Sequence, residues 1–552
     1  MNSFRLQTKI ILAITIGTVF ACQPKETTKP DHIVNIINFI RQTEPRIDEI
    51  TDEVLYQTVV NQIDQLNQYS LPGTFLLQYD ALINPKYQSL LKANISKGME
   101  VGGWWEITQP HVEAAGMQWR GRFPWDWHAD VGFATGYTPD EREKLVDVYM
   151  EKFLEIFGKY PASVGSWFID AHTLGYMHDK YGITASCNCK DQIGTDGYTL
   201  WGGYWNQAYY PSRKNAYMPA QNINAQIPVP IFRMLGSDPI YQYDTGLGSS
   251  HQGVISLEPV YTKGGGNRKW VKWFFKSMFE DPYLTFNYVQ AGQENSFTWK
   301  SMKKGLEIQI PLLDSLRKQG KIRVETLEES GKWFKKQFPV TPPTALSALT
   351  DIQENGNKTL WFNSRYYRTN LLWHDKSFRF RDIHMFDETF ASDYIDKAGT
   401  STQCIYKTLP VVDGFSWSKR DSITGLRIMF TDENQQLTEI ELEDPSISSP
   451  TKNTLLVECN STTGKSFRIL FKEDMFEVSC NDKDFKWFLE FKTPFPKRLP
   501  FTSIDNNSLY AIFNGHQYHI DCQANEIKEI APGRVQFIPA NGKTAFMMNC
   551  RH

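Results

Sequence analysis

The fold of this chain is decided by three apolar segments, HIVNIINFI (32–40), GTFLLQYDAL (73–82) and MEVGGWWEI (99–107). Each segment has the length and apolar content of a buried strand. Between them lie two segments with a helical spacing of apolar residues, 52–69 and 87–98. Strands that alternate with helices predict parallel strands joined by helical crossovers, so this region predicts a parallel sheet or a barrel.

The alternation continues towards the middle of the chain. Thr138 can cap a helix whose first turn begins with Pro139, and this helix should end at Gly158. Further segments have the character of strands (163–170, 183–189, 228–235 and 283–291) or of helices (267–279 and 301–320). We therefore expect the barrel domain to cover residues 32–343.

Residues 344–552 have a different pattern. Helical periodicity fades, and short runs of alternating apolar and polar residues are broken by Asn, Asp, Gly and Ser. Such runs are typical of a β-sandwich. Pro339, Pro342 and Pro343 mark the junction. The sequence therefore predicts an α/β protein, a barrel followed by a C-terminal β-sandwich domain.

The composition limits the class of protein. The chain has 552 residues, of which 59 are basic and 62 acidic, and its net charge of −3 weighs against a nucleic-acid partner. The apolar fraction of 41% and the charged fraction of 22% are those of a globular protein. Aromatic residues reach 14%, and eight of the 16 Trp lie between Trp104 and Trp205. This clustering suggests ring-lined grooves for sugars, although a large aromatic core would have the same composition.

Residues 1–22 have the pattern of a targeting segment. Basic residues precede the apolar run IILAITIGTVF, and Val-Phe-Ala-Cys at 19–22 resembles a lipobox. We expect Cys22 to carry a lipid and residues 23–31 to form a polar tether. The protein would then lie in the periplasm or at the cell surface, anchored to the outer membrane. Cleavage nearby without lipidation is the alternative.

A further signal lies in the order of short motifs. Gly73-Thr74-Phe75, a helix and Gly98-Met99-Glu100-Val101-Gly102 follow one another. This order resembles the polysaccharide deacetylase layout of the glycoside hydrolase/deacetylase superfamily, in which a Thr-Phe strand, a helix and a Gly-His-Glu-Ile-Gly-type strand are consecutive. The resemblance covers about residues 31–330 and implies an irregular (β/α)7-type barrel.

The resemblance also implies a metal site, and here the chain departs from the family. Metal-dependent deacetylases carry an Asp pair after the first strand, where this chain has Phe39-Ile40-Arg41. Their His-x-x-x-His motif aligns with Trp104 and Thr108, which are not metal ligands of the needed kind. We therefore expect no metal or other cofactor. Other branches of the superfamily are glycosidases that work with two carboxylates, and this chemistry fits the chain better.

Four carboxylates end predicted strands: Asp80, Glu106, Asp170 and Glu294. The carboxyl ends of parallel barrel strands meet on one rim, where barrel active sites lie. Glycoside hydrolysis needs two carboxyl groups. Glu106 and Asp170 have Trp neighbours, and apolar rings can raise the pKa of a carboxyl group. We expect Glu106 and Asp170 to be the catalytic pair and Asp80 and Glu294 to bind substrate. Each could instead be a capping or surface carboxylate.

Aromatic residues near these acids are candidates for stacking on sugars. Side chains alternate along a strand, so Trp104 should share a face with Glu106. Trp167, Trp201 and Trp205 are further candidates, the last two in an aromatic, Gly-rich loop. A folded cover over the barrel is the alternative role for this loop.

Two arginines, Arg41 and Arg46, follow the first predicted strand. They could hold an anionic sugar, or they could form an internal ion pair. The sequence alone leaves both interpretations open.

These features predict a carbohydrate-active hydrolase, most simply a glycoside hydrolase that uses paired carboxylates on a polysaccharide or oligosaccharide. The expected partners are the glycan substrate and, through the lipid anchor, a membrane. A polysaccharide deacetylase-like hydrolase and a non-catalytic glycan-binding lipoprotein are the alternatives.

Overall fold

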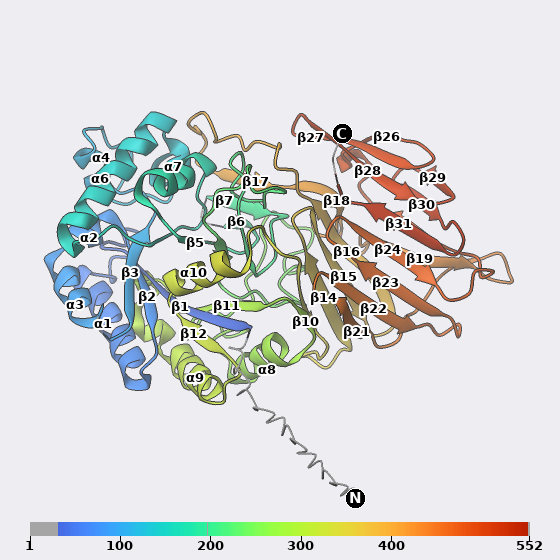
Figure 1. Ribbon diagram of the computed structural model, residues 1–552, viewed down its shortest axis with the longest axis horizontal. Coiled ribbons are helices and arrows are strands. Elements are labelled where there is room, and N and C mark those ends of the chain that lie inside the picture. Colours follow the sequence, from blue (N-terminus) through green and yellow to red (C-terminus); the bar gives the residue numbers. More distant parts are fainter. Residues whose placement is uncertain (1–30, 96, 196, 550–552) are drawn as a thin grey trace, which may run out of the picture.

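The computed structural model describes residues 31–95, 97–195 and 197–549 (Figure 1). The predicted signal peptide, Cys22 and all of the predicted tether except Asp31 lie outside the described residues. Figure 1 shows a barrel with its helices on the left of the view and layered sheets on the right. Within the described residues, no helix has the length and apolar content needed to cross a membrane.

Parallel strands form the wall of the barrel, in the order β11-β1-β2-β3-β4-β5-β9. Their bounds are β1 His32–Ile40, β2 Gly73–Leu77, β3 Met99–Trp104, β4 Ser163–Gly165, β5 Ala185–Asn188, β9 Ile231–Arg233 and β11 Asn287–Ala291. β12 (Arg323–Glu325) also pairs with β1, and β8 (Ala208–Tyr209) adds an antiparallel edge. Every residue of β1, β2 and β3 is buried, which explains their near-continuous apolar sequences. The predicted irregular (β/α) barrel is confirmed.

Helices cover the outside of the barrel (Figure 1). Their bounds are α1 Asp52–Tyr69, α2 Tyr79–Ile83, α3 Pro85–Ile95, α4 Gln109–Ala114, α5 Ala129–Gly132, α6 Pro139–Phe157, α7 Ala171–Tyr181, α8 Arg268–Glu280, α9 Thr298–Lys318 and α10 Leu327–Gln337. α6 begins with a capping box between Thr138 and Glu141 and ends at Gly158, whose φ of 73° is left-handed. The helix predicted after Thr138 is confirmed, whereas the sequence did not predict β12 and α10.

Two antiparallel sheets form the C-terminal sandwich. The first continues from β13 through β14, β15, β16, β19, β25 and β30 to β29. Its strands are β13 Thr344–Ala348, β14 Asn357–Asn363, β15 Tyr367–His374, β16 Ser377–Met385, β19 Gly425–Thr431, β25 Trp487–Lys492, β29 Glu526–Ala531 and β30 Arg534–Ile538. The second contains β21 Ser446–Thr451, β22 Thr454–Asn460, β23 Ser466–Phe471, β24 Met475–Cys480, β26 Phe501–Ile504, β27 Ser508–Phe513, β28 His516–Gln523 and β31 Lys543–Met547. Phe380 of the first sheet packs on Phe476 of the second, with ring centroids 5.3 Å apart. The predicted β-sandwich is confirmed.

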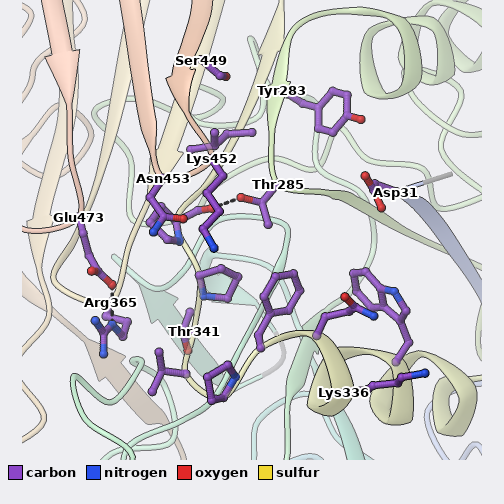
Figure 2. A pocket seen from close by; sticks show the side chains of 18 of the residues that line it. Asp31, Tyr283, Thr285, Lys336, Thr341, Arg365, Ser449, Lys452, Asn453 and Glu473 are labelled. Carbon is purple, nitrogen blue, oxygen red and sulfur yellow. Dashed lines mark hydrogen bonds and ion pairs between the residues drawn. The ribbon is translucent and has the colours of Figure 1, made fainter. Parts of the chain in front are cut away.

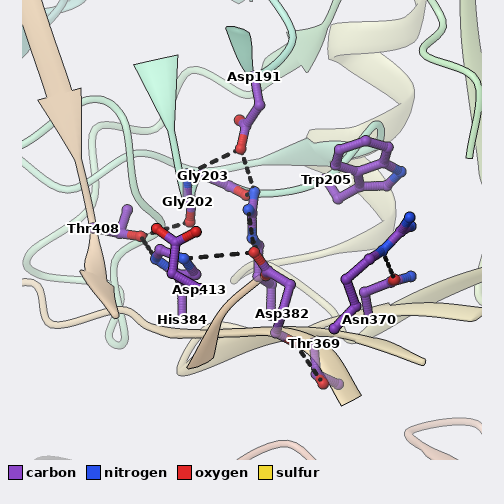
Figure 3. Close-up of polar contacts among 12 residues, drawn as sticks. Asp191, Gly202, Gly203, Trp205, Thr369, Asn370, Asp382, His384, Thr408 and Asp413 are labelled. Atoms are coloured by element: carbon purple, nitrogen blue, oxygen red, sulfur yellow. Dashed lines mark hydrogen bonds and ion pairs between the residues drawn. The ribbon is translucent and has the colours of Figure 1, made fainter. Parts of the chain in front are cut away.

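Strands and charges join the barrel to the sandwich. β10 (Tyr283–Leu284) pairs with β13, and β7 (Tyr198–Trp201) pairs with β17 (Cys404–Lys407). A buried network also crosses the junction (Figure 3). It links Arg233 and Asp191 of the barrel region to Arg368 and Asp382 of the sandwich; we call these four residues the junction network.

Candidate active site

Three charged side chains meet at the rim formed by the carboxyl ends of β1, β3 and β11. Arg41 directly follows β1, while Glu106 and Glu294 come shortly after β3 and β11. The Arg41 guanidinium donates from Nε and Nη2 to the two carboxylate oxygens of Glu106, at 3.0 and 2.7 Å. Its Nη1 donates to Glu294 Oε1 at 3.0 Å. Arg41 therefore forms an internal ion pair, and this pair joins two of the predicted site carboxylates.

Two residues that follow β2 complete the group. The Gln78 side-chain amide donates to Glu106 Oε2. Asp80 lies in the first turn of α2 and not on a strand, because β2 ends at Leu77. Its carboxylate accepts a hydrogen bond of 2.8 Å from the backbone N–H of Ala81 and feels the charges of Glu106 and Arg41. We call this group the rim cluster: Arg41, Gln78, Asp80, Glu106 and Glu294.

The pKa values of two rim carboxyl groups are shifted upward. Asp80 is 7% exposed and Glu294 is 4% exposed. Burial, with a further contribution from the Glu106 charge, raises the pKa of Asp80 to about 7. Burial also raises the pKa of Glu294 to about 7, although the charge of Arg41 opposes this shift. Among the described residues Glu294 Oε2 has no hydrogen-bond partner. Both groups can therefore keep a proton close to neutral pH.

The indole ring of Trp125 covers the rim cluster. The guanidinium carbon of Arg41 lies 4.0 Å from the ring centroid and that of Arg46 lies 5.0 Å from it, which are cation–π distances. Glu44 holds Arg46 through hydrogen bonds of 2.7 and 2.6 Å. Trp125 is 1% exposed, and no residue of the rim cluster is more than 7% exposed, so the rim cluster is enclosed in this structure.

The rim cluster does not have the donor set of a metal site. Among the described residues no group of three or more His, Cys, Asp or Glu side chains could hold a metal ion. The position after β1 carries the Arg41 guanidinium, a fixed cation that already pairs with Glu106 and Glu294. The residues present therefore do not fit the metal that the deacetylase layout implies, and no step below is routed through a metal.

Asp170 has a different environment from the rim cluster. It is the N-cap of α7 and accepts hydrogen bonds from the Thr173 N–H at 2.9 Å and from the Thr173 hydroxyl at 2.6 Å. It also forms an ion pair of 3.0 Å with Arg142, and both side chains are fully buried. No hydrogen bond or ion pair found among the described residues joins Asp170 to Glu106. The capping role is shown, and the catalytic pairing of these two acids stays a prediction.

Trp104 and Trp167 lie inside the barrel. Trp104 is fully buried, and its ring stacks on Phe39 with centroids 4.1 Å apart. Trp167 is 9% exposed and packs edge-on against Trp104 at 5.4 Å. In this structure both rings belong to the core, contrary to the expectation that they face a sugar.

Trp201 and Trp205 lie at the junction with the sandwich. The Trp201 indole N–H donates to Asp413 at 3.0 Å, and the Trp205 ring stacks on Trp361 with centroids 3.7 Å apart. Both tryptophans are buried. The aromatic loop is therefore a folded cover between the domains, which is the alternative that the sequence left open.

Sequence reasoning missed Gln78 and Trp125. Gln78 is the first residue after β2, so the rule that polar residues at the carboxyl ends of barrel strands form the site could have identified it. Trp125 lies in a loop, where a bridge with Thr108 positions it. No local sequence pattern indicates that contact.

The comparisons with known proteins concern the fold. No protein-family model and no curated protein matches the chain. A solved structure from Parabacteroides distasonis, provisionally described as a glycoside hydrolase/deacetylase, aligns with a TM-score of 0.54 and 16% identity over 72% of this chain and 95% of that chain. A Mycobacterium smegmatis protein provisionally described as a polysaccharide deacetylase aligns with a TM-score of 0.36 and 11% identity, over 57% of this chain and 94% of that chain. The first match shows that the chain shares the fold of that protein, in agreement with the layout on which the predicted resemblance rests. The second score is too low to support an argument.

Proposed function

We propose that the protein is a carbohydrate-active hydrolase whose reaction takes place at the rim cluster. The observation that carries the proposal is the pairing of Arg41 with Glu106 and Glu294, within electrostatic reach of the buried Asp80, at the end of the barrel where barrel enzymes hold their active sites. Carboxyl groups whose pKa is shifted by burial and by a charged neighbour are typical of reaction centres. The fold shared with a protein described as a glycoside hydrolase/deacetylase supports a glycan as the substrate.

Hydrolysis of a glycosidic bond fits these groups best. Asp80 or Glu294, each with a pKa of about 7, can donate its proton to the oxygen of the leaving sugar as the bond breaks. Glu106, which Arg41 holds by two hydrogen bonds, can take a proton from a water molecule whose oxygen bonds to the sugar carbon. Return of that proton from Glu106 to the acid restores the cluster.

Removal of an acyl group from a glycan is the second candidate, and Arg41 favours it. Hydrolysis of an ester or amide places negative charge on the carbonyl oxygen, and a buried guanidinium can stabilise that charge. Arg41 would have to exchange a carboxylate partner for this oxygen. A proton on Glu294 weakens its bond to Arg41, so Glu294 is the partner that Arg41 would release.

Access to the rim cluster requires movement of its cover. The Trp125 ring lies directly against Arg41, and the acids beneath it are almost fully buried. We therefore expect substrate to displace Trp125 before it meets the carboxyl groups.

The product identifies the reaction. Purified protein is incubated with acetylated and unacetylated oligosaccharides, and new reducing ends and released acetate are measured in parallel. Reducing ends support the glycosidase, and acetate without reducing ends supports the deacetylase.

Glu106→Gln should remove either product. Glu490→Gln should not, because Glu490 is a buried acid of the sandwich that pairs with Arg534. Glycan binding without either product would refute hydrolysis and favour a binding protein.

The location of the protein is a separate part of the proposal. The lipobox-like sequence that ends at Cys22 motivates an outer-membrane lipid anchor. Cys22→Ser should shift the protein from the membrane fraction to the soluble fraction. Equal membrane retention of this variant would contradict the anchor and leave the proposed reaction untouched.

A further inference from the structure

A cleft of about 1450 Å³ lies between the barrel and the sandwich (Figure 2). Asp31, next to β1, and Arg323, at the start of β12, line its barrel side, so the cleft lies at the amino ends of these strands. Lys452 and Asn453, in the turn between β21 and β22, line it from the sandwich. No residue of the rim cluster contributes to its lining. The cleft is therefore separate from the proposed reaction centre, which lies at the carboxyl ends.

Three aromatic rings line this cleft and are only half-buried: Tyr283, Trp333 and Phe338. Their partial exposure distinguishes these rings from Trp104, which is fully buried. Trp333 packs edge-on against Phe338 with centroids 5.6 Å apart, and the Arg323 guanidinium carbon lies 4.8 Å from its ring centroid. These contacts hold the ring in place while part of its surface stays open. A fixed aromatic surface suits the apolar C–H face of a sugar, because little side-chain entropy is lost on binding.

The cleft also offers polar groups that are not engaged with the protein. Among the described residues, the side chains of Lys336, Lys452 and Asn453 have no ion pair or hydrogen bond. Figure 2 shows Lys452 and Asn453 on the sandwich side and Lys336 on the side of α10. Sugar hydroxyl groups can accept hydrogen bonds from all three. Arg365, by contrast, is held by Glu473 at 2.6 Å.

We propose that this cleft binds an oligosaccharide, as a second glycan site separate from the rim cluster. Its volume exceeds the roughly 300–1000 Å³ of common small-ligand pockets, so several sugar units fit. Half-exposed rings provide stacking surfaces, and the free amine and amide groups provide hydrogen bonds from two walls. A chain bound here is held at the opposite end of the barrel from the carboxyl groups, so binding does not depend on the proposed reaction.

Isothermal titration calorimetry with hexasaccharides of xylose, glucose, N-acetylglucosamine and galacturonic acid tests the proposal. We expect the wild-type protein to bind at least one of them. Trp333→Ala should weaken that affinity about tenfold, because it removes a stacking ring. Trp299→Ala is the matched control, since Trp299 is a half-buried tryptophan of α9 outside the cleft lining. Glu106→Gln should bind as tightly as the wild type.

A second variant decides the question if Trp333→Ala does not fold. Lys452→Ala combined with Asn453→Ala changes an exposed turn and should weaken binding about threefold or more. A preference for the galacturonic acid chain that disappears in this variant would show that the turn with Lys452 and Asn453 contacts the carboxylate. The proposal is overturned if no hexasaccharide binds the wild type at millimolar concentration, or if the cleft variants bind unchanged. Loss of binding in Glu106→Gln alone would place the glycan at the rim and also overturn it.

Discussion

Two buried charge networks in this chain differ in their balance. In the junction network, two arginines alternate with two aspartates, and ion pairs such as Arg233–Asp191 at 2.7 Å and Arg368–Asp382 at 2.8 Å join them. In the rim cluster, the single guanidinium of Arg41 faces three carboxyl groups. Both networks are shielded from water, but only the first has one guanidinium for every carboxyl group.

This difference in balance decides the direction of the pKa shifts. Burial raises the pKa of Asp382, but the charge and hydrogen bonds of Arg368, with contributions from His384 and Tyr243, together offset this, and the net shift is downward. At the rim, burial and the neighbouring carboxylate leave Asp80 and Glu294 with a raised pKa. The junction network, with equal numbers of arginines and aspartates, holds the two domains together. The carboxyl groups of the rim cluster outnumber its guanidinium, so they retain protons that a reaction can use, and their burial lowers the stability of the fold.

The largest expected effect is on the junction network. Arg368→Met would leave Asp191 and Asp382 buried without their shared cation, so we expect the free energy of unfolding to fall by about 3–5 kcal/mol. Denaturant unfolding measures this change. Arg468→Met is the control, because Arg468 and its partner Glu458 are about half exposed, at 56% and 49%, and loss of this pair should cost about 1 kcal/mol or less. Equal losses in the two variants would contradict a structural role for the junction network.

The next effect concerns turnover. Glu106→Gln should lower turnover by about 100-fold or more, because it removes the carboxylate at the centre of the rim cluster. Steady-state kinetics on the glycan identified by product analysis measure the loss. The variant should stay folded, because Arg41 keeps its ion pair with Glu294. Near-normal turnover would remove Glu106 from the mechanism.

Asp170→Asn separates capping from catalysis. Asn can still cap α7, but Arg142 loses its buried carboxylate, so we expect a stability loss of about 1–3 kcal/mol. If capping is the only role of Asp170, turnover per folded molecule should remain close to that of the wild type. A 100-fold loss in fully folded protein would instead support the predicted pairing with Glu106.

The dependence of stability on pH provides a further test of the rim cluster. The pKa values of Asp80 and Glu294 are raised to about 7, so between about pH 5 and pH 7 the folded state binds more protons than the unfolded state. Stability should therefore fall as pH rises through this window, by about 1.4 kcal/mol per pH unit for each group. Asp80→Asn should reduce this slope, as measured by unfolding at several pH values. An unchanged slope would show that Asp80 is ionised throughout.

Much of the fold could be predicted because its signals are local. The predicted segments at 32–40 and 52–69 coincide with β1 and α1, since continuous apolar runs and helical spacing need no distant partner to be recognised. The ends of shorter strands were less predictable. The segments predicted at 73–82 and 163–170 contain strands that stop at Leu77 and Gly165, after which the chain turns into the rim.

The candidate site could be predicted only in part. Placing acids at strand ends identified Glu106, Asp80 and Glu294, because parallel strands present their carboxyl ends together. The same rule could not show that Asp170 caps α7 and pairs with Arg142, since that pairing depends on how α6 packs beside α7. The aromatic residues next to Asp170 in the sequence fit a hydrophobic core as well as a sugar-binding site, so they could not decide the role of Asp170.

The sequence by itself determined the order of barrel and sandwich and the row of acids at the strand ends, because these follow from periodicity along the chain. Only the tertiary structure decided which acids share a cation and which rings stay open to solvent. Arg41 reaches Glu106 and Glu294 across 65 and 253 residues of sequence. Trp205 is buried by Trp361, a residue of the other domain. Burial and charge pairing depend on such distant neighbours, and no local pattern in the chain encodes them.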